Sequence, residues 1–266
     1  MHIFWLAFIQ GMTEFLPISS SGHLILFAKY TNFEDQGQVI DIALHIGSLI
    51  AVVLYFWHTI KSMLEELFKN KFLPKLNISG VRLAYYLLFA TLPAIIIGAI
   101  LSYFGMDWVR SSKLIGWMLI IYGIILWYAD TKFKDNKTLE NMSLSGAILI
   151  GFAQCLAFIP GTSRSGITIT AGRLMGFNRS EIAKFSMLLS VPSILAAGIL
   201  AAYKLYHSAE VSHITMAYQS VCWSFIFSFI AIWFMMKWLQ TKTFLPFVIY
   251  RIILGCLLLA NAYNLF

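Results

Sequence analysis

The sequence predicts an all-α polytopic membrane protein with six transmembrane helices and two re-entrant helical hairpins in an inverted repeat. The prediction rests on its composition, on its long apolar stretches and on two breaks rich in proline, glycine and serine. Of the 266 residues only 12% are charged, 59% are hydrophobic and 16% are aromatic. A soluble domain carries about 25% charged residues. We therefore expect residues 1–266 to form a single membrane domain with little soluble structure.

The charge and cysteine patterns narrow the function classes. The net charge is +7, but the basic residues lie between apolar stretches without interleaved aromatic residues. Basic loops facing an anionic membrane leaflet explain this charge better than nucleic-acid binding, so no nucleic-acid partner is expected. The three cysteines are scattered through apolar stretches without metal-ligand spacing, which argues against a disulfide framework or a zinc site.

Six uninterrupted apolar stretches are long enough to cross a bilayer, which takes about 20 residues. Residues 58–81 between the first two mix acidic and basic residues with apolar ones, and we expect an amphipathic surface helix there. The six predicted spans are residues 38–57, 83–104, 111–129, 185–203, 214–236 and 243–266.

Two further apolar stretches are interrupted. Residues 3–28 are broken at 17–22 and residues 143–176 at 160–166, by proline, glycine and serine. Each half is too short to span a bilayer, since proline ends a helix and glycine permits a tight turn. We predict that each stretch is a re-entrant hairpin, because irregular backbone at membrane depth must line protein or a watery cavity. For one break alone, a kink packed by small residues would be the better explanation.

The loop charges predict an orientation. Each hairpin is taken to leave the membrane on the side from which it entered. Then 13 of the 19 lysines and arginines lie on one face of the membrane, four on the other and two inside the membrane. The positive-inside rule puts the face with 13 in the cytoplasm. Both termini then lie outside the cell, and the expected location is a bacterial plasma membrane.

The two breaks also indicate an internal repeat. A shift of 143 positions lays residues 15–20 over residues 158–163, and both segments contain Phe-x-Pro-x-[Ser/Thr]-Ser. The repeats would be about 1–130 and 143–266, each with one hairpin and three spans. Since three is odd, the second half would insert upside down, as in many transporters. Apolar sequences also align by chance, which is the alternative explanation.

Inverted hairpins would bring their tips together near the membrane midplane. The hydroxyl residues at the tips, Ser19, Ser20, Ser21, Thr162 and Ser163, are good N-cap residues for the returning half-helices. Two helix N-termini that converge with their positive dipole ends and free amides form an anion site.

Charged residues inside the membrane are costly and usually functional. Arg164 lies at the second tip between Ser163 and Ser165, and Thr168 follows one turn later. A guanidinium, hydroxyls and helix N-termini together suit a phosphate or diphosphate.

The first hairpin supplies a carboxylate and an imidazole. Glu14 and Gln10 share one helix face, and His23 lies one turn into the returning half-helix. A carboxylate beside a phosphate site suits a metal ligand or a general base.

Three other polar residues in apolar stretches have structural explanations as good as functional ones. His45 can hydrogen-bond within the bundle, and Asp41 can lie at the outer interface. Arg251 can snorkel to the cytoplasmic side, form a structural ion pair or support packing.

The two motifs resemble those of a known family. Residues 10–23, Gln-Gly-Met-Thr-Glu-Phe-Leu-Pro-Ile-Ser-Ser-Ser-Gly-His, resemble the (Glu/Gln)-x-x-x-Glu and Ser-Ser-x-Gly-His segment of the undecaprenyl-diphosphate phosphatases, the bacitracin-resistance family. Residues 160–168, Pro-Gly-Thr-Ser-Arg-Ser-Gly-Ile-Thr, match that family's Pro-Gly-x-Ser-Arg-Ser-x-x-Thr at every fixed position. The resemblance covers nearly the whole chain.

The resemblance implies an integral membrane hydrolase that converts undecaprenyl diphosphate to undecaprenyl phosphate and phosphate. This lipid carrier serves peptidoglycan synthesis and cell-wall biogenesis, and its recycling underlies bacitracin resistance. The resemblance further implies a divalent cation, Mg²⁺ or Ca²⁺, a site open to the outer face and possibly a homodimer.

The predicted roles follow from both lines of reasoning. Glu14, Ser20, His23 and Arg164 are the catalytic candidates, with Ser20 as nucleophile or phosphate ligand and His23 as base or acid. Glu14 and Gln10 are the metal-ligand candidates, although Gln10 stands where the family often has a second glutamate. The substrate-binding candidates are Ser19, Ser21, Ser163, Ser165 and Thr168.

A flippase or an anion secondary transporter is the alternative function, because inverted hairpins with a midplane anion site also suit transport. The cluster of Glu14, Ser20, His23 and Arg164 favours an enzyme, since a pure carrier has less need of an acid–base pair.

Overall fold

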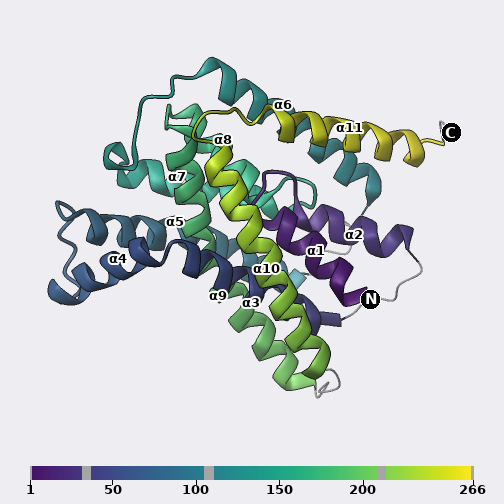
Figure 1. The fold of residues 1–266 in the computed structure, drawn as a ribbon, viewed down its shortest axis with the longest axis horizontal. Coiled ribbons are helices and arrows are strands. Elements are labelled where there is room, and N and C mark those ends of the chain that lie inside the picture. Colours follow the sequence, from purple (N-terminus) through teal and green to yellow (C-terminus); the bar gives the residue numbers. More distant parts are fainter. Residues whose placement is uncertain (1, 32–36, 105–110, 209–213, 265–266) are drawn as a thin grey trace.

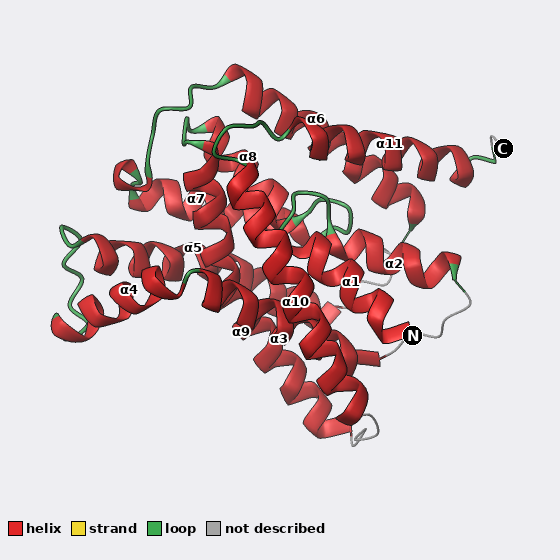
Figure 2. Ribbon diagram, viewed as in Figure 1, coloured by secondary structure: helices red, strands yellow, loops and turns green. Residues whose placement is uncertain are grey.

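The computed structural model describes residues 2–31, 37–104, 111–208 and 214–264. Within these ranges the chain is helical, with eleven α-helices, two short 3₁₀ helices and no strand (Figures 1 and 2). The all-helical prediction is confirmed.

The first half of the chain contains six α-helices and the second half five. The first six are α1 (His2–Glu14), α2 (Ser20–Tyr30), α3 (Gly37–Tyr55), α4 (Trp57–Lys69), α5 (Ser79–Phe104) and α6 (Ser112–Lys132). The 3₁₀ helix η2 (Leu139–Asn141) precedes α7 (Leu144–Cys155), and η3 (Leu156–Phe158) separates α7 from α8 (Arg164–Leu174). The chain ends with α9 (Arg179–Ser208), α10 (Ile214–Trp238) and α11 (Leu245–Ala262).

Five helices among the described residues are long and apolar enough to cross a membrane. They are α5, α6, α9, α10 and α11, and they coincide with five of the six predicted spans. The sixth predicted span, residues 38–57, corresponds to α3, which meets the criterion only together with α4. The axis bends by 78° between these two helices, so the chain has up to six spans if this bent pair is one.

Helix α4 lies in the segment where the sequence predicts a surface helix. Its exposed side chains alternate between charged ones, such as Lys61 and Glu65, and large apolar ones, such as Leu64 and Phe68. A helix with this pattern is typical of the membrane interface, where one face is immersed in lipid and the other in water.

The interrupted stretches form two pairs of short helices, α1 with α2 and α7 with α8. These helices have 11 to 13 residues each, and the two members of each pair pack against one another. The loops that join them lie inside the molecule, among the surrounding helices (Figure 2).

The long helices hold the two pairs in related surroundings. Helix α1 packs on α10 and α7 packs on α5, while α3 and α9 contact each other. Helices α6 and α11 also run side by side (Figure 1).

A close approach holds α3 against α10. A Cβ at Gly47 would come within 2.4 Å of the Val221 carbonyl oxygen, so only glycine allows this spacing. Next to it, Ser48 hydrogen-bonds with Ser224 and Ser228 at 3.1 and 2.9 Å. Small residues and interhelical hydroxyl bonds are the usual means of association inside a membrane, where the hydrophobic effect does not bring helices together.

A buried ionic network joins the end of α6 to α8 and α9. The Arg173 side chain is fully buried and donates to Asp130 and Asp135, and Arg179 donates to the same two carboxylates. Asp130 also accepts from the backbone amide of Phe244, just before α11. Arg173 and Arg179 are two of the 13 loop cations that the sequence analysis counted on one face of the membrane. In the structure both form ion pairs with acidic residues.

This network leads to a prediction about stability. Asp130→Ala leaves Arg173 buried without one of its carboxylates, so we expect the free energy of unfolding to fall by about 3–5 kcal/mol. Denaturant titration in detergent micelles measures the change. Lys61→Gln removes an exposed ion pair with Glu65 and is the control, with an expected change below about 1 kcal/mol. Equal stabilities for the two variants would contradict a structural role for the network.

Candidate active site where two helix breaks meet

The returning helices of both pairs begin with the same unusual cap. Ser19 precedes α2 with φ 76° and Ser163 precedes α8 with φ 73°, in a region that non-glycine residues rarely occupy. Each serine Oγ accepts a hydrogen bond from a glycine amide three residues on, Gly22 at 3.3 Å and Gly166 at 3.1 Å. The two N-termini are therefore fixed by their side chains.

The two loops are bonded directly to one another. The Ser19 Oγ accepts from the backbone amide of Gly161 at 3.1 Å, and the Ser165 Oγ donates to the Leu16 carbonyl at 2.9 Å. Gly161 has φ 94°, and a Cβ there would lie 2.7 Å from the Ile115 carbonyl oxygen. The tips thus form one interlocked unit, as the sequence predicts for converging hairpins.

Arg251 of α11 is hydrogen-bonded to this unit. It is fully buried, and among the described residues it has no carboxylate partner. Its guanidinium donates instead to backbone carbonyls of α6 and of both loops. Of the alternatives that the sequence left open, neither snorkelling nor an ion pair is seen among the described residues, and a structural role in packing is. The five acceptors are Pro17, Met118, Leu119, Gly161 and Thr162, at 3.0 to 3.3 Å.

Glu14 lies at the centre of the polar cluster that the loops enclose. Its Oε1 accepts from Arg164 Nη2 at 2.7 Å, and its Oε2 accepts from Ser20 Oγ at 2.5 Å and from Gln10 Nε2 at 2.9 Å. The Glu14 side chain is 7% exposed and that of Arg164 is 19% exposed. The structure therefore brings together four of the residues predicted from the sequence, from both halves of the chain.

The first amides of the two returning helices are available to a ligand. In the described part of the chain, the backbone N–H groups of Ser20, Ser21, Arg164 and Ser165 have no acceptor. Amides at a helix N-terminus bind phosphate readily because the helix dipole adds to their own polarity. The cluster thus combines a cation, hydroxyls and free amides.

The donor set also fits a hard divalent cation that arrives with a phosphate ligand. The Oε1 atom of Gln10 is buried without a hydrogen-bond partner, and Glu14 lies beside it. Within the described residues no group of three histidine, cysteine or acidic side chains could hold a metal alone. Mg²⁺ commonly binds one or two protein oxygens and completes its shell with substrate phosphates and water.

Most of the remaining predicted hydroxyls are engaged in the fold. Ser19 and Ser163 are caps, and Thr168 is buried, where its hydroxyl bonds the Arg164 carbonyl and the Ser186 hydroxyl. Ser165 ties the loops together, as described above. Ser21 is exposed, with its Oγ 3.5 Å from that of Ser19, so its hydroxyl is more accessible than that of Ser19.

His23 is turned away from the Glu14 cluster. Its Nδ1 lies 2.7 Å from the Ser19 carbonyl oxygen and its Nε2 lies 2.6 Å from the Tyr250 hydroxyl. The two rings are stacked, with centroids 5.6 Å apart. His23 and Tyr250 therefore form a wall beside the site, and His23 has no hydrogen bond to Ser20 or Glu14.

The other two polar residues in this region belong to α3. His45 Nδ1 lies 2.8 Å from the Asp41 carbonyl oxygen, one turn back in the same helix.

This chain is similar to the members of a known family. The family model for "Bacitracin resistance protein BacA" matches residues 3–257. The chain belongs to the BacA family. Family relatives named undecaprenyl-diphosphatase include those of Ruegeria pomeroyi and Chromohalobacter salexigens, both 44% identical over 264 residues. These matches cover 99% of this chain and 98% of the relative in the first case, and 97% of each in the second.

A third relative of that name, from Alteromonas mediterranea, is 44% identical over 258 residues, or 97% of each chain. The BacA family match and the apolar helices together make this chain an integral membrane protein.

Sequence reasoning missed the Tyr250 partner of His23 and the backbone partners of Arg251 in this BacA-family chain. Tyr250 and Arg251 both lie in the last span, 227 to 234 residues from their partners in the first loop region. The only signal in the sequence was an arginine in an apolar stretch, which does not reveal what the guanidinium binds.

The interlocked loops lead to a prediction about Gly161. Gly161→Ala adds a Cβ in a left-handed conformation and against a backbone oxygen, so we expect a loss of about 2–4 kcal/mol in unfolding free energy. The control is Gly198→Ala in α9, where a Cβ meets nothing within 4 Å and alanine favours the helix. Denaturant titration compares them, and a Gly161 variant as stable as the control would refute the interlock.

Proposed function

We propose that this chain hydrolyses undecaprenyl diphosphate to undecaprenyl phosphate and inorganic phosphate. The observation that supports this most directly is the Glu14, Ser20 and Arg164 cluster at two capped helix N-termini. The names of the relatives agree, and none of these relatives carries the name of a flippase or transporter.

The diphosphate would bind between the two tips. Arg164, now paired with Glu14, is partly exposed and can turn its guanidinium to the terminal phosphate. The amides at the starts of α2 and α8 donate to further phosphate oxygens. This exchange of partners frees the Oε1 atom of Glu14 for a cation, while its Oε2 atom still accepts from Ser20 and Gln10.

Ser20 would then be the nucleophile. Its Oγ already donates to Glu14 at 2.5 Å, which places a proton acceptor on the attacking hydroxyl. A bond forms between Ser20 Oγ and the terminal phosphorus, the bond to the bridging oxygen breaks, and undecaprenyl phosphate leaves. Water then cleaves the phosphoserine, releases phosphate and restores the hydroxyl. Positioning and charge neutralisation by Arg164 and the amides supply most of the catalysis.

A divalent cation, Mg²⁺ or Ca²⁺, would be held by Glu14, the free Oε1 of Gln10 and phosphate oxygens. When bound, it supplies positive charge that neutralises the diphosphate and its leaving group. His23 is placed to orient the substrate through Tyr250, since its hydrogen bonds lie on that side.

We also propose that the short pairs α1–α2 and α7–α8 are re-entrant hairpins of an inverted repeat, with six spans around them. Three equivalences support this repeat: Gln10 with Gln154, Ser19 with Ser163, and Gly22 with Gly166. All three are 144 positions apart, one more than the sequence breaks suggest. Helix α1 packs on α10 of the second half, and its equivalent α7 packs on α5 of the first half. Such reciprocal packing is expected of a repeat.

The expected setting is the bacterial plasma membrane, with the site facing outside. This placement rests on the loop charges and the positive-inside rule. The homodimer implied by the family resemblance stays a prediction.

The central test is phosphate release from farnesyl or undecaprenyl diphosphate by the purified protein in detergent. We expect release in the wild type and a loss of at least about 1,000-fold in Glu14→Gln and Arg164→Ala, which is on the order of 4 kcal/mol of transition-state stabilisation. The exposed variant Lys61→Gln should retain full activity. A folded protein that releases no phosphate from either lipid would refute the proposal.

The neighbouring serines separate the nucleophile from a ligand. Ser20→Ala should lower kcat by at least about 100-fold, whereas Ser21→Ala, which changes an exposed hydroxyl, should lower it by less than about tenfold. Rapid-quench measurements with radiolabelled substrate should detect phosphoserine in the wild type. Near-normal kcat in Ser20→Ala would assign the attack to water.

Gln10 and its repeat counterpart Gln154 provide a test position and a matched control for metal binding. EDTA should abolish phosphate release, and Gln10→Glu should lower the Mg²⁺ concentration for half-maximal activity at least about threefold, because carboxylates bind Mg²⁺ better than amides. Gln154→Glu should leave this concentration unchanged. An equal response of the two variants would exclude Gln10 as a metal ligand.

A further inference from the structure

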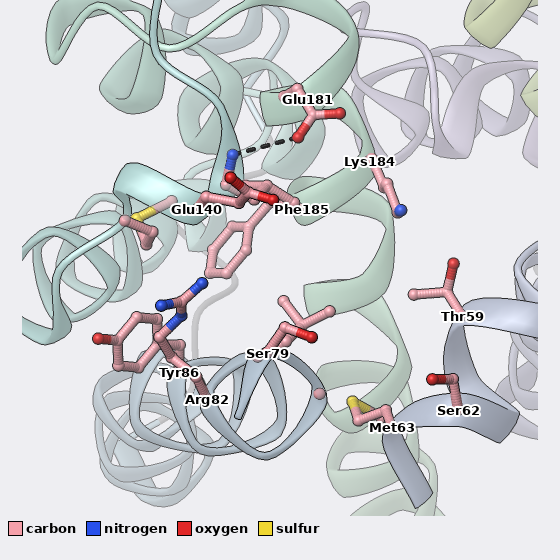
Figure 3. A pocket seen from close by; sticks show the side chains of 14 residues that line it. Thr59, Ser62, Met63, Ser79, Arg82, Tyr86, Glu140, Glu181, Lys184 and Phe185 are labelled. Atoms are coloured by element: carbon pink, nitrogen blue, oxygen red, sulfur yellow. Dashed lines mark hydrogen bonds between the residues drawn. The ribbon is translucent and has the colours of Figure 1, made fainter. Parts of the chain in front are cut away.

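A cavity lies apart from the Glu14 cluster and shares no residue with it. It has a volume of about 330 Å³ and opens between α4, the start of α5, η2 and α9 (Figure 3). This volume is at the lower end of the range for small-molecule sites.

The cavity wall carries charges of both signs without partners. Within the described residues, the side chains of Arg82, Lys184 and Glu140 make no hydrogen bond and no ion pair. The fourth charged side chain, Glu181, is engaged with the backbone amide of Leu139 at 3.1 Å (Figure 3). Two free cations and one free carboxylate thus face a single cavity.

A separate apolar groove lies farther along α5, on the same face of that helix. It has a volume of about 260 Å³, and Phe89, Pro93 and Ile96 line it together with residues of α7. Arg82 and Tyr86 line the cavity, and the spacing from 82 through 86, 89 and 93 to 96 keeps all five residues on one face of the helix. At 1.5 Å per residue this stripe is roughly 21 Å long, more than one leaflet of hydrocarbon.

Helix α4 places the cavity at the level of the lipid headgroups. It forms one wall through Thr59 and Ser62, and its exposed Leu64 and Phe68 suit the membrane interface. A polar cavity at this level and an apolar groove farther along the same face of α5 suit the headgroup and one acyl chain of a phospholipid.

We propose that the cavity binds a phosphoethanolamine headgroup and the α5 groove binds one acyl chain of the same lipid. Arg82 and Lys184 bind the phosphodiester, and Glu140 accepts a hydrogen bond from the primary ammonium. A lipid with phosphate and no amine would leave Glu140 as an unpaired negative charge beside its headgroup. A quaternary ammonium has no N–H to donate to Glu140.

The test is a lipid titration of the delipidated full-length protein in detergent, with binding measured by native mass spectrometry. Phosphatidylethanolamine is compared with phosphatidylcholine and phosphatidylglycerol of the same acyl chains. We expect phosphatidylethanolamine to bind at least about tenfold more tightly than either. Glu140→Gln should reduce its advantage over phosphatidylcholine to less than about threefold, and Arg82→Ala should weaken binding of all three lipids.

Two further variants separate the headgroup from the chain. Ile96→Asn in the groove should weaken the two-chain lipid but leave binding of soluble glycerophosphoethanolamine unchanged. Lys61→Gln, on α4 but outside the cavity, should change nothing. Equal affinity for the three lipids, unchanged selectivity in Glu140→Gln, or displacement by farnesyl phosphate at equal concentration would each overturn the proposal. Circular dichroism and thermal melts confirm that each variant is folded.

Discussion

The structure depends on how the backbone polar groups at the breaks between α1 and α2 and between α7 and α8 find hydrogen-bond partners in the interior. Away from water, every carbonyl that leaves a helix needs a donor. Arg251 supplies donors to both loops and to α6, while Ser19 and Ser165 bond one loop to the other. The polar centre is thus built on side chains that hold the main chain, and Glu14, Ser20 and Arg164 are positioned by it.

Much of the site was predictable because its parts are local in sequence. A break rich in proline, glycine and serine predicts a helix N-terminus, and Glu14 and Arg164 stand at fixed short distances from their breaks. Converging tips followed from the inverted-repeat hypothesis. The roles of the individual serines did not follow, since Ser19 and Ser20 are equally good caps by residue type and only the backbone conformation separates them.

The fold was predictable in its number of apolar segments and less so in their directions. The hydropathy of the sequence predicted α5, α6, α9, α10 and α11. It does not reveal that the helix axis bends by 78° between α3 and α4. The partners of buried charges were equally hidden. In the sequence Arg173 and Arg179 look like ordinary loop cations. Only the tertiary structure brings Asp130 and Asp135 to them.

The Glu14–Arg164 pair has a consequence for how the protein is made. The two residues are 150 positions apart and belong to opposite halves of the chain. During synthesis Glu14 is therefore made long before Arg164, and its carboxylate can meet the guanidinium only after the second loop has been made. The ion pair at the centre of the site forms only when both halves of the chain are present.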